Sequence, residues 1–213
     1  MTRVKICGIS TFDAGQVALD EGADFLGFVF YPPSHRFIEP DNAARLIERL
    51  RAHRPVGWQA VGVVVNIPLG TMNEIAQRCA LDLIQVCGDE GEAYCRALER
   101  PSIKALRLGQ GSVPNRDIFE PGRHGASRVL IDSHREGMYG GTGETANWTA
   151  LKPYLGDAIL AGGLDPTNVG EAIADARPWG VDVSSGVERD KRKDPHLIRE
   201  FLRAVHALDG VPQ

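Results

Sequence analysis

Residues 4–30 read VKICGISTFDAGQVALDEGADFLGFVF and carry the clearest structural signal in the chain. The apolar run at residues 4–8 indicates a strand, and the amphipathic run from about Thr11 to Glu21 is typical of a helix. A second apolar run at residues 24–30 indicates another strand. A strand, a helix and a strand in so short a stretch predict a parallel βαβ unit.

The same alternation continues to the end of the chain. Further strands are expected at residues 59–65, 81–86, 103–107, 128–132, 158–160 and 180–183, with helices at 41–53, 69–79, 90–99, near 114–119 and at 148–154, and helical sequence after each of the last two strands. Eight strand–helix units of roughly 27 residues each fit a (β/α)8 barrel, so we expect one barrel domain over residues 1–213. The alternative is a doubly wound open sheet. That fold would normally place a GxGxxG turn after the first strand, where this chain has Cys7-Gly8-Ile9-Ser10.

The composition of the chain argues against two classes of function, nucleic-acid binding and membrane insertion. The chain has 24 lysines and arginines against 28 aspartates and glutamates, so it lacks the basic excess that general electrostatic binding to nucleic acid requires. No apolar run approaches the about 20 residues that span a bilayer, and the N-terminus lacks the apolar segment of a signal peptide. We therefore expect a cytoplasmic enzyme or binding domain that contacts neither nucleic acid nor membrane.

The four cysteines show no CxxC pair and no zinc-binding spacing, so we expect free thiols and no metal site. Cys79, Cys87 and Cys95 lie in apolar or helical surroundings and are interpreted as packing residues. Cys7 ends the first strand, at the end of the barrel where such enzymes carry their chemistry. A small buried side chain is the ordinary interpretation of such a cysteine, but its position favours a chemical role.

Two further residues strengthen that prediction. Strand alternation puts Lys5 on the same face as Cys7, where its ammonium would favour the thiolate. Asp132 ends an apolar strand, where a charge has no use in packing, although a turn cap is the alternative interpretation. The glycine-rich loop after Asp132, which includes Gly141, could close over a site as a lid.

Loops after three strands predict anion binding. Gly162 and Gly163 follow the seventh strand and Ser184-Ser185-Gly186 follows the eighth, the two loops from which barrel phosphate sites are frequently built. Tight turns explain either loop alone, but both together predict a phosphate site. Arg36, in the Pro-rich loop after the second strand, could bind a carboxylate through two hydrogen bonds. His35 beside it is interpreted as a polar loop residue.

Taken together, these motifs closely resemble the phosphoribosylanthranilate isomerase family of tryptophan biosynthesis, whose members are (β/α)8 barrels. The resemblance runs from residue 4 to about residue 205 and is carried by Val4-Lys5-Ile6-Cys7-Gly8-Ile9, Ser34-His35-Arg36-Phe37-Ile38, Gly140-Gly141-Thr142-Gly143, Gly162-Gly163-Leu164 and the run GVDVSSGVE at 180–188.

The resemblance implies a role for each motif. Cys7 would be the general base, Asp132 the general acid, and Arg36 the partner of the anthranilate carboxylate. The loops at 162–163 and 184–186 would hold the phosphate. It also implies that the following residues bind substrate: Lys5, Gln85, Gly141 and Asp182.

The implied reaction converts N-(5-phosphoribosyl)anthranilate into 1-(2-carboxyphenylamino)-1-deoxyribulose 5-phosphate. An acid protonates the furanose ring oxygen and a base removes the proton from C2, so two proton-transfer groups suffice without a metal or other cofactor. The expected partner is this phosphorylated small molecule. We expect a monomer, with a homodimer as the alternative.

The chain departs from the family pattern in two places. Where the family usually reads Gln-Leu-His-Gly it has Gln85-Val86-Cys87-Gly88, and where the glycine loop usually ends in Phe-Asp-Trp it has Ala146-Asn147-Trp148.

Two alternative functions remain open. One is another aminoaldose or sugar-phosphate isomerase on the same barrel, and the other is a catalytically silent barrel that only binds a phosphorylated metabolite. An acid, a base and a phosphate site together favour an enzyme.

Overall fold

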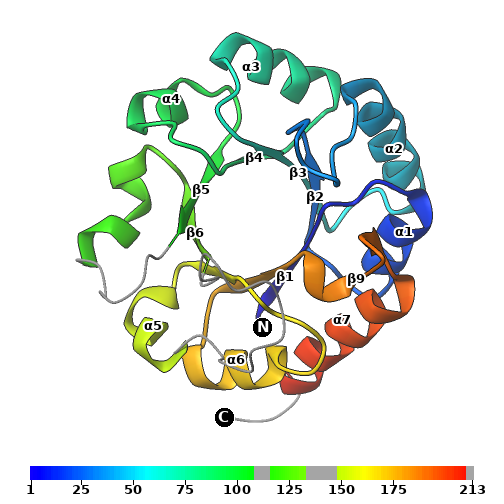
Figure 1. The fold of residues 1–213 in the computed structure, drawn as a ribbon, viewed down its shortest axis with the longest axis vertical. Coiled ribbons are helices and arrows are strands. Elements are labelled where there is room, and N and C mark those ends of the chain that lie inside the picture. The colour runs from blue at the N-terminus through cyan, green and yellow to red at the C-terminus, as the bar shows by residue number, and fades with distance from the viewer. Residues whose placement is uncertain (108–115, 133–147, 210–213) are drawn as a thin grey trace.

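The computed structural model describes residues 1–107, 116–132 and 148–209. Eight parallel strands pair in chain order, and β8 pairs with β1 to close a barrel (Figure 1). The closed barrel confirms the predicted fold class and excludes the open sheet. The strands are β1 (Arg3–Cys7), β2 (Phe25–Val29), β3 (Gln59–Val64), β4 (Leu83–Val86), β5 (Ser102–Arg107), β6 (Arg128–Asp132), β7 (Ile159–Ala161) and β8 (Gly180–Val183).

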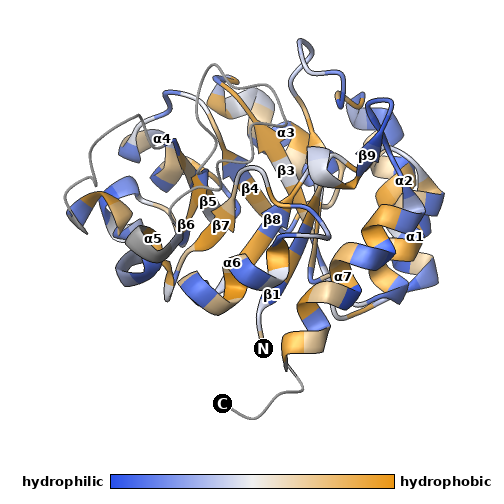
Figure 2. Cartoon of the chain, turned by 60° about the horizontal axis from the view of Figure 1, so that its bottom comes forward, coloured by the Kyte–Doolittle hydropathy of each residue, from blue (hydrophilic) through white to orange (hydrophobic). Residues whose placement is uncertain are grey.

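Helices surround the barrel (Figure 1). They are α1 (Phe12–Asp20), α2 (Pro40–His53), α3 (Leu69–Arg78), α4 (Glu92–Ala97), α5 (Trp148–Leu155), α6 (Val169–Ala176) and α7 (Pro195–Asp209). In α7 the spacing of Ile198, Phe201, Leu202 and Val205 places all four on one face, and each is fully buried. Figure 2 shows the result, with strands largely apolar and helices that alternate apolar and polar residues.

The barrel interior is packed rather than hollow at its centre. Phe25, Val61, Ile103, Leu130 and Ile159 come from five different strands and form one buried apolar cluster. Inward-pointing side chains fill small barrels in this way, so function is confined to the ends.

An ion pair lies across the strand pair that closes the barrel. Lys5 of β1 is in register with Asp182 of β8, and its Nζ lies 2.9 Å from the Asp182 carboxylate. Both side chains are buried. A Cβ added to Gly27 would lie 3.1 Å from both Lys5 Nζ and Cys7 Sγ. The ammonium and the thiol therefore lie side by side, as strand alternation predicts.

The predicted strand and helix boundaries agree with the structure to within about two residues. Two short features differ. Two 3-10 turns, η1 (Arg116–Phe119) and η2 (Pro121–His124), stand where a single short helix was expected near residues 114–119. A small hairpin of β9 (Glu188–Arg189) and β10 (Arg192–Lys193) follows the 3-10 turn η3 (Ser185–Val187) and was not predicted, because two-residue strands leave no periodic signal.

A substitution at Gly180 tests how closely β8 packs against β1. A Cβ at Gly180 would lie 2.9 Å from the Arg3 carbonyl oxygen, a backbone atom of β1. Gly180→Ala should therefore lower the free energy of unfolding by about 1–3 kcal/mol, measured by chemical denaturation. Gly170→Ala is the matched control, because a Cβ there meets only the tip of Leu208 at 4.0 Å. Equal stability of the two variants would contradict this account of the closing strands.

Candidate active site

A cavity of about 330 Å³ opens at the C-terminal ends of the strands. Most of the site residues that the sequence predicts line this cavity. They come from six loops or strand ends: Cys7, Arg36, Gln85, Asp132, Gly162, Gly163, Asp182, Ser184 and Ser185. Lys5 lies beside Cys7 and is fully buried. Gly141, the glycine-rich loop around it and Ala146-Asn147 lie outside the described residues.

Burial raises the pKa of the Cys7 thiol, and the charges of Lys5 and Lys193 oppose that effect without overcoming it. Burial also disfavours the charged form of Lys5, but Asp182 and, after it, Cys7 outweigh this effect and raise the pKa of the ammonium. The sequence prediction that Lys5 favours the thiolate is thus right in direction. The effect of Lys5 on the pKa of Cys7 is limited first by burial of the thiol and then by the opposing charge of Asp182.

Arg36 already holds a carboxylate of the protein itself. Its Nε and Nη2 donate hydrogen bonds of 2.6 and 2.8 Å to Glu188, whose other neighbours are Lys193 and His35. Burial alone would raise the pKa of Glu188, but the hydrogen bonds from Arg36 and Lys193 lower it to about 2. His35, interpreted from sequence as a polar loop residue, lies 3.4 Å from the Glu188 carboxylate.

Glu188 and Lys193 are the residues that sequence reasoning missed. Residues 188–194 are seven consecutive charged residues, which sequence alone indicates as a solvated segment. In the structure, Asp190 and Lys191 both have positive φ angles, which form the two-residue turn typical of a tight hairpin. The hairpin places Glu188 opposite Lys193 and buries both side chains. No local pattern marks Lys193, whereas Glu188 ends the run at 180–188 that carries the resemblance, without a role being assigned to it.

The loop after β7 is held in a tight turn. Gly162 and Gly163 have φ angles of +96° and +68°, a region that favours glycine. The Asn168 side chain donates to the Gly163 carbonyl and accepts from the Asp165 backbone N–H, each at 2.9 Å. These bonds hold the loop in place at the edge of the cavity.

The loop after β8 packs directly on its neighbours. A Cβ on Gly186 would overlap with the Leu164 carbonyl oxygen, so only glycine allows this approach to the loop after β7. Ser184 Oγ donates to the Cys7 carbonyl at 3.2 Å and so joins the exits of β8 and β1. The three predicted phosphate-loop residues thus differ in position: Ser184 and Ser185 line the cavity, and Gly186 lies where the two loops meet.

Gln85 lines the cavity, and its side-chain amide is part of the cavity wall. Its Nε2 lies 3.3 Å from Cys87 Sγ, and its buried Oε1 has no hydrogen-bond partner among the residues that the structure describes. Burial raises the pKa of Cys87 to about 11, and the Gln85 contact only partly offsets this, so position 87 presents a neutral thiol. Cys87 lines the cavity rather than serving packing alone.

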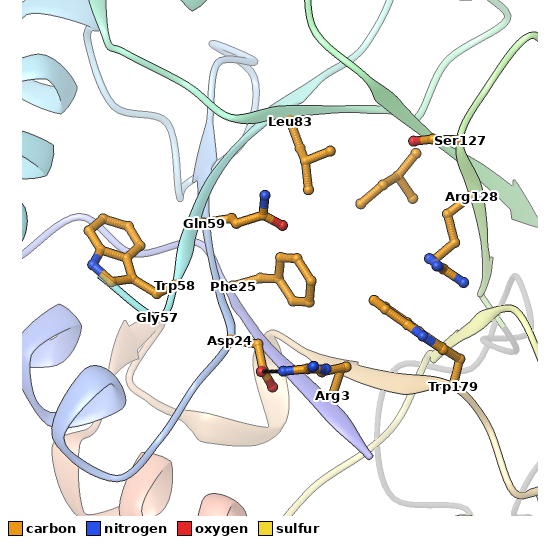
Figure 3. Close-up of a pocket in the computed structure, with 11 residues that line it drawn as sticks. Arg3, Asp24, Phe25, Gly57, Trp58, Gln59, Leu83, Ser127, Arg128 and Trp179 are labelled. Atoms are coloured by element: carbon orange, nitrogen blue, oxygen red, sulfur yellow. Dashed lines mark hydrogen bonds and ion pairs between the residues drawn. The ribbon is translucent and has the colours of Figure 1, made fainter. Parts of the chain in front are cut away.

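A larger hollow of about 520 Å³ lies at the opposite end of the barrel (Figure 3). Its charged groups are already engaged, because Arg3 pairs with Asp24 and the Arg128 guanidinium stacks 3.6 Å from the centre of the Trp179 ring. Phe25 forms part of its apolar floor. Barrel enzymes carry their chemistry at the other end, where the thiol, the carboxylate and the glycine loops meet.

Among residues 1–107, 116–132 and 148–209, no group of three or more His, Cys, Asp or Glu side chains could hold a metal ion. No helix in the same residues is long and apolar enough to cross a membrane.

Comparison with known proteins identifies the family. Residues 4–204 match the family model for N-(5'phosphoribosyl)anthranilate (PRA) isomerase. The chain is 44% identical to the N-(5'-phosphoribosyl)anthranilate isomerase of Geotalea daltonii, with 99% of each chain covered. It is 45% identical to that of Geobacter sulfurreducens over 95% of this chain and 98% of that one.

Solved structures of phosphoribosyl anthranilate isomerases have the same fold as this chain. Phosphoribosyl anthranilate isomerase from Thermotoga maritima superimposes with a TM-score of 0.83 at 34% identity, covering 97% of this chain and all of that one. A structure of such an enzyme in complex with reduced 1-(o-carboxyphenylamino)-1-deoxyribulose 5-phosphate has a TM-score of 0.79 at 32% identity, with the same coverage. Sequence, fold and site agree, and the chain belongs to the N-(5'-phosphoribosyl)anthranilate isomerase family.

Proposed function

We propose that this protein isomerises N-(5-phosphoribosyl)anthranilate to 1-(2-carboxyphenylamino)-1-deoxyribulose 5-phosphate in tryptophan biosynthesis. One observation carries the proposal: a thiol, a carboxylate, an arginine and two glycine- and serine-containing loops line a single cavity. These are the groups that a phosphorylated, carboxylate-bearing sugar needs for binding and for two proton transfers. Membership of the family supports the same reaction.

In the proposed mechanism Asp132 is the acid and Cys7 the base. Asp132 gives its proton to the furanose ring oxygen, the C1–O bond breaks, and the lone pair of the anilino nitrogen forms the C1=N bond. Cys7 then removes the C2 proton, and the electron pair of that bond produces an enolamine that tautomerises to the ketone. Cys7 ends β1 and Asp132 ends β6, so the two groups reach the cavity from different strands.

The two ends of the substrate are assigned to different loops. Backbone N–H groups around Gly163 and Ser185 would hold the phosphate. Arg36 uses its Nε/Nη2 edge for Glu188, and a planar guanidinium has a second edge, formed by Nη1 and Nη2, that can bind the anthranilate carboxylate. Gln85 lines the same cavity and is assigned to substrate binding.

Turnover by the purified protein tests this function. Loss of substrate fluorescence on addition of the protein, followed by recovery of the deoxyribulose product, is the expected result. A folded protein that binds the substrate without converting it would instead support a silent phosphometabolite-binding barrel. Conversion of a different aminoaldose alone would support the other isomerase alternative.

Three general properties remain predictions. We expect the chain to be a single domain, a monomer and cytoplasmic. Light scattering on the purified protein measures the oligomeric state, and one cooperative unfolding transition is expected of one domain.

The acid and base assignments predict losses of turnover. Cys7→Ser and Asp132→Asn should each lower kcat by about 100-fold or more, with smaller changes in KM, because each removes a group needed in the transition state. Serine keeps the size of the side chain but ionises far less readily. Circular dichroism should show both variants folded. A folded Cys7→Ser variant with the parent kcat would show that this thiol is not the base.

The raised pKa of Cys7 predicts the pH dependence of the parent. Only the thiolate can act as a base, and its fraction grows as pH rises toward the pKa. kcat/KM should therefore increase with pH on the alkaline side of neutrality. The same rise should be missing from Cys7→Ser, and a rise shared by both proteins would assign it to another group.

Gly163 allows a charge-specific test of the phosphate site. No atom lies within 4 Å of a Cβ added there, and Asp and Asn both tolerate its positive φ better than most residues. Gly163→Asp should raise KM strongly because it sets a carboxylate against the phosphate. Gly163→Asn, of the same shape without the charge, should raise KM less. Equal KM values for the two variants would remove the phosphate from this loop.

Arg36 predicts selectivity for the carboxylate. Arg36→Ala should weaken binding of a carboxylate-bearing product analogue by about 2–4 kcal/mol, measured by competitive inhibition. An analogue without the carboxylate should lose much less. Equal losses for both analogues would count against the assignment, because they would reflect a general change in the loop.

A further inference from the structure

Lys193 is an ammonium buried at the exit of β8. Its side chain is 4% exposed, and its Nζ donates to the Ser184 carbonyl at 2.9 Å and to Glu188 Oε1 at 2.5 Å, with Ser184 Oγ at 3.4 Å. A buried lysine is costly unless its donors are satisfied. Here the acceptors all come from the loop after β8 and its hairpin, so Lys193 holds that loop in one conformation.

The same network reaches Arg36. Glu188 accepts from Lys193 through Oε1 and from Arg36 through both oxygens. A Cβ added to Gly8 would lie 2.7 Å from Arg36 Cδ and 3.4 Å from Lys193 Nζ. The backbone just after Cys7 therefore lies against both cations. We call Arg36, Glu188 and Lys193 the charge clamp.

The clamp carries a net positive charge. It has two cations and one carboxylate, whereas the nearby Lys5 and Asp182 neutralise each other. Without Lys193, Glu188 would neutralise Arg36 and the clamp would carry no net charge. A substrate with a phosphate and a carboxylate, and a base that works as a thiolate, all gain from a positive charge held at this position.

Several charged or titratable groups face Cys7. They are Lys5 on β1, Asp182 on β8, Cys87 after β4, Asp132 on β6 across the cavity, and Lys193 on β10. Burial dominates and raises the pKa of Cys7, while Lys5 and Lys193 lower it. Lys5 is bound directly to Asp182, whose charge acts on the thiol in the opposite direction. The carboxylate bound to Lys193, Glu188, is shared with a second cation, Arg36.

We infer that Lys193 is a positioning residue: it ties the loop next to the phosphate site to Arg36 through Glu188 and supplies positive charge beside Cys7. The inference rests on the proposed function for its consequences in turnover. The geometry of the clamp stands independently of it.

Lys193→Met removes the charge and keeps much of the length. It should lower kcat/KM about tenfold or more, raise KM, and move the rise of kcat/KM to higher pH, because the thiolate loses a favourable charge. Lys193→Arg should restore the position of that rise. Arg192→Met is the matched control, since Arg192 is exposed in the same hairpin, and it should behave as the parent.

Alkylation of Cys7 provides a readout that needs no isomerase activity. The rate of reaction with iodoacetamide, followed at the Cys7 peptide by mass spectrometry, should rise with pH, and the rise should occur at higher pH in Lys193→Met than in the parent or Arg192→Met. If the parent has no isomerase activity but the alkylation profile of Lys193→Met is still shifted relative to that of the parent, the proposed function is wrong and the inference stands.

Two results would overturn the inference. One is an unchanged alkylation profile in a folded Lys193→Met variant whose activity has fallen, which would make Lys193 a merely structural residue. The other is parent-like kinetics in that variant. If Lys193→Met does not fold, Lys193→Gln offers the same charge removal with a polar end group, and the same two results apply to it.

Discussion

The structure depends on the ion pair between Lys5 and Asp182, which lies inside the barrel where its first and last strands meet. Neither charge could remain buried without the other, because an unpaired ion in such a place costs several kcal/mol. The pair requires Lys5 and Asp182 to lie opposite each other. A shift of one residue in the pairing of β1 and β8 would turn one of them out of the interior. The same register brings Ser184 to the Cys7 carbonyl and so sets the loop after β8 against the proposed base.

Two groups of charged side chains lie near Cys7. Lys5 and Asp182 neutralise each other, and the Lys5 ammonium lies beside the thiol. The charge clamp of Arg36, Glu188 and Lys193 carries one net positive charge and reaches the exits of β1, β2 and β8. Rigid, paired side chains of this kind keep their orientation before a ligand arrives, so little free energy is lost in ordering them on binding. The result is a cavity prepared for an anionic sugar, with a thiol and a carboxylate on separate strands.

The barrel was predictable because the strands and helices of each βαβ unit differ in the spacing of their apolar residues, which is visible in the local sequence. The alternation in residues 4–8 also correctly placed Lys5 beside Cys7. Interactions between residues far apart in the sequence could not be predicted in this way. Asp182 lies 177 residues from Lys5, so the neutralisation of that ammonium left no local pattern. Glu188 and Lys193 stand within seven consecutive charged residues, and only the tight hairpin turns them inward. Arg36 was recognised as an anion-binding residue, but its first partner is a carboxylate from the far end of the chain.

In the proposed mechanism one cavity binds the phosphate and the carboxylate of the substrate and holds its sugar carbons between Cys7 and Asp132. A crystal structure of this protein with the reduced deoxyribulose product analogue would show whether this is so. We expect the phosphate against the loops at 162–163 and 184–186, the carboxylate on the Nη1/Nη2 edge of Arg36, and the sugar carbons between the Cys7 thiol and the Asp132 carboxylate. An analogue bound in the hollow at the opposite end of the barrel, or one with its phosphate on Arg36 and its aromatic ring against Gly163, would contradict it.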